Sequence, residues 1–316
     1  MPKLPKILAS TWDNGVFVLD DSGIRQELPN QPVQGLSSDL KGGATASVGG
    51  NSLYRRDADG SWNLLARHDH TISTTFTNNQ GTFVGTDDAC VLALTQNGDL
   101  KQIDNFDSIA GRDQWFAGTA IIDGKVLGPP LGVRSLHGAS SELLLANVHV
   151  GGIPRSVDGG NTWTPTIDVS FDAHEVHVDN NNANLVVAAT AVGLCMSHDG
   201  GDTWSLHTQG LHSEYCSAVT ISGQSVFVAA SESHFSPQGA IYRRSTNPGV
   251  ETLEKVEGGL PNWLEGIADT SCIAAKYNQM VIISAMGSVY VSSDAGQKWV
   301  ELEETVPGVS SVLIVD

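Results

Sequence analysis

The chain has 316 residues, of which 40% are apolar, and its 35 acidic side chains outnumber 17 basic ones for a net charge of −18. This acidity argues against a nucleic-acid partner, because phosphate backbones are bound by basic surfaces. No run of 18 or more apolar residues occurs, and the start MPKLPKILASTWDNG contains no long apolar stretch. We therefore expect neither a membrane span nor a signal peptide.

The cysteines and glycines indicate the compartment and the secondary-structure class of the protein. Cys90, Cys195, Cys216 and Cys272 form no C-x-x-C pair, and each lies in an apolar, strand-like run. This pattern predicts reduced, buried thiols in a cytoplasmic protein. The 34 glycines, together with short runs rich in Val, Ser and Thr, favour β-strands over helices.

The first predicted unit of the chain is incomplete. Its strands fall at 6–11, 15–21 and 24–28, whereas later units have four strands. The final segment, 310–316 with the sequence SSVLIVD, offers a fourth strand. We expect this C-terminal strand to pair with the N-terminal unit and close a ring, which removes the exposed edges of an open sheet.

Units of four short strands recur along the chain with a period of about 45 residues, which is the size of one propeller blade. In one clear unit the strands are 174–179, 184–191, 193–199 and 203–208. Seven such units can be counted. The sequence therefore predicts an all-β, seven-bladed β-propeller of four-stranded antiparallel blades, formed by residues 1–316 as a single domain.

One segment, 105–132, breaks this period. It is too long for a turn between blades, and a long connection in a compact domain is usually functional or disordered. The segment contains Trp115, Phe116 and Ile121. We therefore expect it to pack over one face of the ring.

A short pattern, Ser-x-Asp-x-Gly-x-x-Trp, occurs three times. It reads SVDGGNTW at 156–163, SHDGGDTW at 197–204 and SSDAGQKW at 292–299. Each copy falls where the third strand of a unit turns into the fourth. There Ser and Asp bond turn N–H groups, Gly permits a positive φ, and Trp fixes the hairpin to the sheet. These roles are structural and require no substrate.

The three copies resemble Asp-boxes, the bacterial neuraminidase repeats, and the blade pattern extends this resemblance over essentially the whole chain. Asp-box propellers include sialidases, other glycoside hydrolases, sortilin-like receptors and photosystem assembly factors. The resemblance therefore implies a fold and not a reaction. The strings GRDQWFAG, GPPLGVRS, NVHVGGIPRS and GLHSEYCSAV are also similar to uncharacterised bacterial glycosyl-hydrolase-like proteins that carry these repeats.

A true sialidase is not indicated. Sialidases bind the substrate carboxylate with an arginine triad, because bidentate guanidinium contacts suit it, and begin with a Phe/Tyr-Arg-Ile-Pro string. This chain begins KLPKILASTW, and its GIPRSVDGG has Ile, Pro and Arg in another order, with Arg155 leading directly into a repeat.

The blade register indicates where a site would lie. Links between blades and turns between second and third strands share one face, whereas the repeats turn on the opposite face. By analogy with other propellers, we expect a site on the first face, near the axis. The expected catalytic residues on that face are His149, His174, His212, Tyr215 and Glu232. The expected substrate-binding residues are Arg112, Trp115, Arg134, Glu175 and His234.

Two chemistries fit these residues. His149, His174 and His212 with a water resemble the shell of one catalytic divalent metal ion, zinc or similar. Without a metal, a His would act as general base, with Tyr215 or a carboxylate as acid and Arg134 holding an anionic group. The metal-free arrangement is similar in outline to propeller-type polysaccharide lyases.

The expected function is a hydrolase or lyase for a glycan fragment or small anionic substrate. Cys216 beside His212 is a further candidate nucleophile. The alternative is a non-catalytic binding or assembly propeller, which predicts an exposed apolar patch that includes Trp115 and Trp263.

Overall fold

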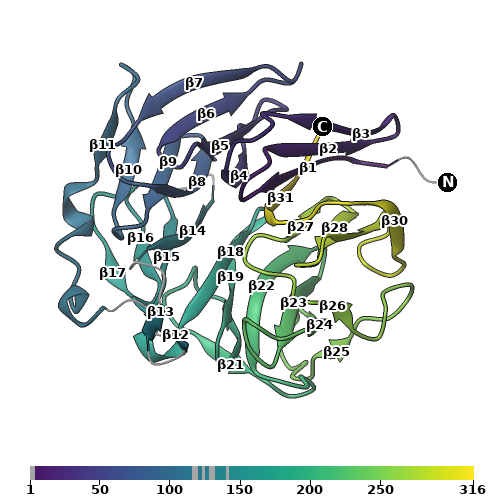
Figure 1. Cartoon of the computed structure of the whole chain (residues 1–316). Coiled ribbons are helices and arrows are strands. Elements are labelled where there is room, and N and C mark those ends of the chain that lie inside the picture. The colour runs from purple at the N-terminus through teal and green to yellow at the C-terminus, as the bar shows by residue number, and fades with distance from the viewer. Residues whose placement is uncertain (1–3, 116–119, 123–124, 128–131, 140–141) are drawn as a thin grey trace.

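The computed structural model describes residues 4–115, 120–122, 125–127, 132–139 and 142–316. Seven four-stranded antiparallel sheets are arranged as blades around a central axis (Figure 1), so the predicted seven-bladed β-propeller is confirmed. Three 3-10 helices lie in the connections: η1 (Asp104–Phe106), η2 (Arg112–Gln114) and η3 (Val169–Phe171). Among the described residues, no helix is long and apolar enough to cross a membrane.

The blades follow one another along the chain, and each runs from an inner to an outer strand. Blade 1 consists of β31 (Val309–Val315), β1 (Lys6–Thr11), β2 (Val16–Asp20) and β3 (Gly23–Glu27). Blade 2 consists of β4 (Val33–Ser38), β5 (Ala44–Val48), β6 (Ser52–Arg56) and β7 (Trp62–Arg67). Blade 3 consists of β8 (Ile72–Asn78), β9 (Gly81–Thr86), β10 (Val91–Leu94) and β11 (Leu100–Gln102).

The remaining blades complete the ring. Blade 4 consists of β14 (Val133–Gly138), β15 (Leu144–Val148), β16 (Pro154–Ser156) and β17 (Thr164–Pro165). Blade 5 consists of β18 (Ala173–Asp179), β19 (Asn182–Thr190), β20 (Gly193–Ser197) and β21 (Ser205–His207). Blade 6 consists of β22 (Tyr215–Ser222), β23 (Ser225–Ser231), β24 (Gln238–Ser245) and β25 (Glu254–Lys255), with β26 (Leu264–Glu265) also paired to β24. Blade 7 consists of β27 (Ile273–Lys276), β28 (Gln279–Ile283), β29 (Ser288–Ser292) and β30 (Val300–Thr305).

The two ends of the chain meet in blade 1. Strand β31 is the innermost strand of that blade and pairs antiparallel with β1, from Lys6 opposite Val315 to Thr11 opposite Val309. Figure 1 shows the C-terminal strand lying against the N-terminal sheet. The expected closure of the ring by the last strand is therefore confirmed.

Apolar layers between neighbouring blades form the core. Strands of adjacent blades contribute Val, Ile, Leu and Ala side chains to seven separate clusters, one at each blade interface. Burial of this apolar surface is the main favourable term in folding. Three cysteines, Cys195, Cys216 and Cys272, are buried and free, and Cys90 is partly exposed.

The interface between blades 2 and 3 differs from the others. Its apolar cluster has four buried members, whereas each other cluster has nine or more. Toward the axis, hydroxyl groups replace apolar contacts: Thr45 Oγ1 lies 2.9 Å from Ser37 Oγ and 3.0 Å from Thr75 Oγ1. This hydroxyl seam holds the two inner strands together by side-chain hydrogen bonds.

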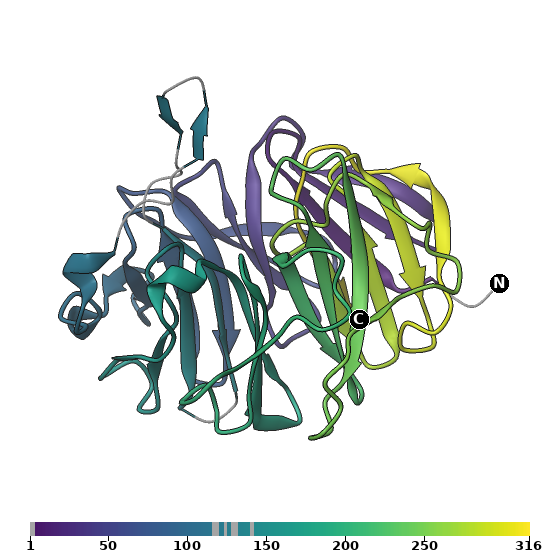
Figure 2. The ribbon, with the colours of Figure 1, turned by 90° about the horizontal axis from the view of Figure 1, so that it is seen from below.

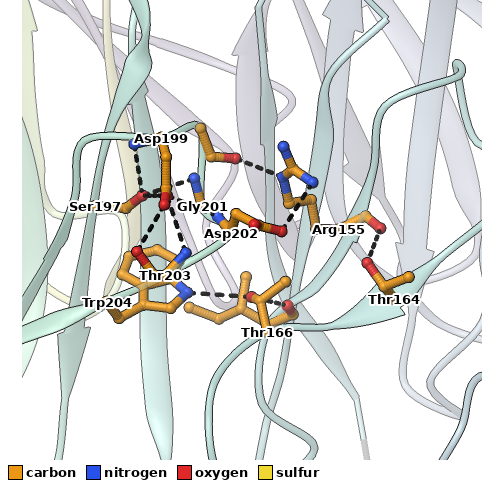
Figure 3. Close-up of polar contacts among 11 residues, drawn as sticks. Arg155, Thr164, Thr166, Ser197, Asp199, Gly201, Asp202, Thr203 and Trp204 are labelled. Carbon is orange, nitrogen blue, oxygen red and sulfur yellow. Dashed lines mark hydrogen bonds and ion pairs between the residues drawn. The ribbon is translucent and has the colours of Figure 1, made fainter.

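The three Ser-x-Asp repeats form one kind of turn between the third and fourth strands. In blade 5 the amide of Gly201 donates to Ser197 Oγ (2.8 Å), and Asp199 accepts from the Thr203 amide and hydroxyl (2.9 and 2.6 Å) (Figure 3). Gly201 has φ of 83°, a left-handed conformation that favours glycine. The same bonds recur at Ser156 and Ser292. The repeat is thus a turn built from its own side chains.

The repeat turn of blade 5 also fastens that blade to blade 4. Arg155 donates to the Gly200 carbonyl (2.8 Å), and Trp204 Nε1 donates to Thr166 Oγ1 (3.1 Å) (Figure 3). Because this turn joins the third and fourth strands, it lies at the end of the blade opposite to the turns between second and third strands. The repeats therefore face away from the expected site.

A buried ion pair joins blades 1 and 2. The Arg56 side chain, 2% exposed, makes two bonds of 2.7 and 2.8 Å to the carboxylate of Glu27. Trp62 Nε1 donates to the same carboxylate at 2.8 Å. Burial raises the pKa of Glu27, but the bonds from Arg56 and Trp62 outweigh it and hold this pKa below its ordinary value. Glu27 is therefore ionised at neutral pH.

The segment 105–132 is partly outside the described residues. Phe106, Ile109 and Trp115 are buried in the apolar cluster between blades 3 and 4. Beyond them, strands β12 (Ala120–Ile122) and β13 (Lys125–Leu127) pair antiparallel. Figure 2 shows this hairpin projecting from the ring. Residues 116–119, 123–124 and 128–131, which include Phe116, lie outside the described residues, so the expectation for the whole segment stays a prediction.

We predict that Ser197→Ala lowers the stability of the fold. The change leaves the buried Gly201 amide without its acceptor, which costs about 1–3 kcal/mol. Thermal or urea unfolding measures this loss. Ser245→Ala is the matched control, because Ser245 occupies the same place in blade 6, which lacks the repeat, and its bond to the Asn247 amide is exposed. Equal effects of the two changes would contradict the prediction.

We predict a larger loss for Glu27→Gln. The change leaves the buried Arg56 guanidinium without a counter-charge, which costs about 3–5 kcal/mol. Asp20→Asn is the control, because Asp20 pairs with Arg25 at the surface and such pairs contribute about 0–1 kcal/mol. Urea unfolding at neutral pH compares the two variants, and a small effect of Glu27→Gln would refute the buried-pair assignment.

Candidate functional site

A cavity of about 270 Å³ opens at the axis of the ring. Its lining comes from blades 1, 2, 3, 4 and 7, always from a link between blades, from a turn between second and third strands, or from the first residues of an inner strand. The polar and aromatic lining includes Trp12, Gln34, Asp87, Arg134, His149 and Asp269. The cavity therefore lies on the face opposite to the repeat turns, as the blade register predicts.

Two of the predicted histidines meet at the interface of blades 4 and 5. His149 follows β15, and His174 is the second residue of β18. Between them lies Asp172, whose Oδ1 is 3.3 Å from His149 Nε2 and whose Oδ2 is 3.8 Å from His174 Nε2. One ligand atom from each of the three residues lies within 4.8 Å of the other two. We call this group the His-Asp-His cluster.

The surroundings fix the orientation of the His174 ring. His174 Nδ1 lies 2.6 Å from the carbonyl oxygen of Cys216 in the neighbouring blade. A carbonyl only accepts, so Nδ1 carries a hydrogen, and in the neutral ring the lone pair of Nε2 faces Asp172. Tyr215 packs against the same ring with centroids 4.6 Å apart. The imidazole therefore has one defined tautomer and one defined direction.

Several buried polar atoms near this cluster lack a hydrogen-bond partner. Within the described part of the chain, the unpartnered atoms include His149 Nδ1, Asp172 Oδ1 and both amide atoms of Asn147. Asn147 is fully buried and lies two residues before His149, on the strand face that carries Leu145 into the interface with blade 5. Native structures rarely leave such groups unpaired, so these atoms make the region a candidate for ligand binding.

Charges around the cluster shift its protonation. Burial, followed by the nearby Arg134 guanidinium, lowers the pKa of His149 to about 4. Burial raises the pKa of Asp172, but the His174 and His149 rings and Arg134 outweigh this and hold it below its ordinary value. Burial raises the pKa of the Tyr215 hydroxyl. At neutral pH the site thus presents a neutral imidazole, a carboxylate and a phenol.

Other predicted site residues lie at the rim. His234 Nδ1 is 3.8 Å from Asp269 Oδ2, and the His234 side chain is 45% exposed. Arg134, at the start of β14, lines the cavity together with Asp269. Arg134 comes from blade 4, whereas His234 and Tyr215 come from blade 6, so the closed ring brings together residues that are distant in sequence.

The prediction for His212 needs correction. Its Nδ1 lies 2.8 Å from the Tyr242 hydroxyl, and its ring packs against Trp263 with centroids 4.7 Å apart. Asp172 occupies the third position that the sequence analysis gave to His212. Glu232 is exposed and does not line the cavity, and its charge opposes the lowering of the His212 pKa by burial. Cys216 is buried and its thiol pKa is raised by burial, which does not favour a nucleophile.

Arg112 and Trp115 also lie apart from the cavity lining. The Arg112 guanidinium stacks over the Trp115 ring at 4.7 Å and donates to the Ala89 carbonyl at 2.9 Å. Trp115 is buried against Phe106 in the cluster between blades 3 and 4. Their packing in the blade interface accounts for both residue types without a substrate.

Glu175 does not line the first cavity. It lines a second cavity of about 350 Å³, which is bordered by the inner strands and includes the packed pair His137 and His177, whose ring centroids are 4.2 Å apart. The carboxylate accepts a 2.8 Å bond from the Val219 amide. Burial raises its pKa to about 8, although the Val219 bond opposes the shift. Glu175 is therefore largely protonated at neutral pH.

The sequence analysis missed Asp172 and Asn147. Asp172 ends η3 with φ of 47° directly before β18, so its backbone turns toward the axis. A signal was present in the string FDAH, which places a carboxylate two residues before His174 at the start of an inner strand. Asn147 interrupts the apolar strand LLANV, and a polar residue in such a run is itself informative.

Solved structures similar to this chain are β-propellers. A GH74 enzyme from Niastella koreensis superposes with a TM-score of 0.63 at 14% identity, covering 93% of this chain and 46% of that one. A GH74 xyloglucanase from Xanthomonas campestris gives 0.57 at 16% identity, covering 95% and 47%. YCF48 bound to a D1 peptide gives 0.58 at 13% identity, covering 95% and 86%.

These likenesses concern the fold alone, because all identities are low. This chain spans less than half the length of the two GH74 structures. No protein-family model matches the chain, and a search of curated proteins finds no match. The function must therefore be argued from the site.

We predict that the protonation of Glu175 makes stability depend on pH. Its folded pKa of about 8 lies above the ordinary 4.5, so the neutral carboxyl stabilises the fold fully below the ordinary value. This contribution declines as the pH rises toward 8. Melting temperatures of the wild type and of Glu175→Gln, measured from pH 5 to 8, should show the wild type losing stability relative to the variant. The prediction would be wrong if the melting temperature of the wild type minus that of Glu175→Gln stayed constant or increased as the pH rises.

Proposed function

We propose that this protein is an enzyme, a hydrolase or lyase, that cleaves a bond in a small acidic sugar or acidic glycan fragment bound in the axial cavity. The observation that carries the proposal is the juxtaposition of Arg134 with the His-Asp-His cluster: His149 and Arg134 line the same cavity, and Arg134 acts electrostatically on His149, Asp172 and Tyr215. A guanidinium beside a reactive cluster suits an anionic substrate.

The lining favours a sugar as the carrier of that charge. Trp12 lines the cavity and is 57% exposed, so it offers an aromatic face to an apolar ring face. Asp87 and Asp269 provide carboxylates that accept hydrogen bonds from hydroxyl groups. These two carboxylates also repel an anion that binds elsewhere, so a substrate carboxylate is directed to Arg134.

The chemistry follows from the positions of the groups. His149 lines the cavity and its neutral imidazole lies 3.3 Å from the carboxylate of Asp172, so together they would take a proton from water or from a carbon next to a carboxylate. The protonated Tyr215 phenol, packed on His174, would donate a hydrogen bond or proton to the leaving oxygen. Arg134 would hold the substrate in register for this transfer.

A second candidate function is non-catalytic binding of a peptide segment. It is favoured by an exposed apolar arc on three consecutive blades, formed by Phe235 (65% exposed), Met286 (65%) and Trp12 (57%). All three occupy turns between second and third strands, on the face that carries the cavity. The two tryptophans expected in such a patch do not contribute to this arc, because Trp115 is buried and Trp263 packs on His212.

We also propose that the chain belongs to the Asp-box group of propellers. The three Ser-x-Asp repeats support this, because in each the Asp carboxylate accepts from a backbone amide four residues later and the Ser hydroxyl accepts from the Gly amide. The same pattern of bonds in three blades indicates one repeated element.

We predict that the cavity binds acidic sugars in preference to neutral ones. Glucuronate and short oligogalacturonides should bind in calorimetric titration, whereas glucose should not. Arg134→Met should weaken the binding of glucuronate by about 10–100-fold, because hydrogen bonds to charged groups contribute about 1.5–3 kcal/mol. Arg25→Met is the control, because Arg25 pairs with Asp20 at the outer strand of blade 1.

Turnover tests the catalytic part of this prediction. Oligogalacturonides and 4-nitrophenyl glucuronide should be cleaved, and formation of an unsaturated product would identify a lyase. Absence of binding by every acidic sugar would refute the proposal. Binding without turnover, or capture of apolar peptides at the arc of Trp12, would decide for the binding module.

A further inference from the structure

We propose that His149, Asp172 and His174 bind one divalent first-row transition-metal ion at the wall of the axial cavity. The ion's coordination would be completed from the cavity side, where a water or substrate oxygen binds. The chemical role of the ion rests on the proposed function, since it would activate that water or polarise the substrate. The binding itself rests on the contacts of the three side chains.

The separations of the ligand atoms fit one shared ion. Metal–ligand bonds of imidazole and carboxylate are about 2.0–2.2 Å, so two ligands of one tetrahedral or octahedral ion lie about 3–3.6 Å apart. The His149 Nε2 to Asp172 Oδ1 distance of 3.3 Å lies within this range, and the His174 Nε2 to Asp172 Oδ2 distance of 3.8 Å is slightly above it. Because one ligand atom from each residue lies within 4.8 Å of the other two, a small shift of the His174 ring would let all three bind one ion.

The direction of the lone pairs calls for a cation in that space. The Cys216 carbonyl holds a hydrogen of His174 on Nδ1, so in the neutral ring Nε2 presents a lone pair to the Asp172 carboxylate. Two acceptors that face each other repel unless a positive charge lies between them. Metal-binding histidines are typically oriented in this way, by a bond from the second ring nitrogen to a carbonyl.

Buried polar atoms without partners point to the same place. His149 is 6% exposed and Asn147 is fully buried, and His149 Nδ1, Asp172 Oδ1 and the Asn147 amide have no hydrogen-bond partner. A bound ion with its water shell would supply partners for Asp172 Oδ1 and for the Asn147 amide. A proton between His149 Nε2 and Asp172 Oδ1 would pair Oδ1 but would leave the Asn147 amide without a partner.

The charge balance agrees with a divalent ion. Two neutral imidazoles and one carboxylate carry one negative charge, so a divalent ion leaves the group with one positive charge. Arg134 adds a second positive charge at the cavity wall. Together they would attract an anionic group and align it with the ion.

A second group of possible ligands, His70, Asp87 and Asp88, lies at the surface of blade 3. His70 and Asp88 are 54% and 38% exposed, and their side chains are 3.5 Å apart. None of its side-chain atoms is a buried, unpartnered one among those the structure describes. This group serves as the internal control for adventitious binding.

Metal binding by the full chain tests the inference without any substrate. The protein is purified without chelators for elemental analysis, then stripped and titrated with ZnCl₂, MnCl₂ and CoCl₂ by calorimetry. We expect one equivalent of at least one ion and a melting temperature that rises when that ion is added. Asp172→Asn should weaken binding by at least about 100-fold, because even outer-shell partners contribute about 10–100-fold.

The variants are chosen to fold and to discriminate. Asn tolerates the left-handed backbone of residue 172, so Asp172→Asn preserves the turn, and His149→Gln provides a second ligand change. His212→Ala, Asp88→Asn and Arg134→Met should retain full metal affinity. Stoichiometric binding that survives Asp172→Asn, or that is lost in His212→Ala or Asp88→Asn, would overturn the assignment, as would the absence of one-to-one binding. Loss of sugar binding in Arg134→Met with metal affinity intact separates this inference from the proposed function.

Discussion

The antiparallel pairing of β31 with β1 is the constraint on which the rest of the structure depends. It turns seven sheets into a closed ring, so every inner strand has a neighbour on both sides. The axial site exists because of this closure. Arg134 comes from blade 4, Asp172 and His174 from blade 5, Tyr215 from blade 6, and Asp269 from the link into blade 7.

The two faces of the ring use polar residues in opposite ways. In the repeat turns, Ser197 and Asp199 form hydrogen bonds to groups within eight residues of sequence, so the turn itself satisfies these side chains. On the cavity face, Asp172 and His149 contact each other across blades and keep atoms without partners. Polar side chains whose hydrogen bonds are all made within one turn have a structural role. Buried polar atoms without a hydrogen-bond partner indicate a region that is available for a ligand.

The fold was predictable from sequence because the evidence for it is local and repeated. Strand length and turn chemistry recur from unit to unit, the Trp-bearing repeat recurs in three units, and the incomplete first unit reveals the role of 310–316. The same register predicted that His149 and His174 lie on the face that carries the axial cavity, and His149 lines that cavity. These are consequences of strand alternation and strand order, which sequence spacing records directly.

The composition of the site was less predictable because it depends on contacts between blades. Tyr242 takes the His212 ring away from the axis, and no spacing rule relates residues 212 and 242. Trp115 was predicted to bind substrate, and its packing against Phe106 was not foreseen because Phe106 lies in a segment without periodicity. Asp172 entered the site through a left-handed turn after η3, a conformation that the sequence indicates only weakly.

The hydroxyl seam between blades 2 and 3 has a mechanical meaning. In a ring that is closed by β31, strain is shared by all interfaces, and the ring yields first where the least apolar surface is buried. The links between Thr45, Ser37 and Thr75 are hydrogen bonds, each of which contributes about 0.5–1.5 kcal/mol. We therefore expect the ring to open first at this interface, two interfaces away from the His-Asp-His cluster, so that transient opening there leaves His149 and Asp172 in contact.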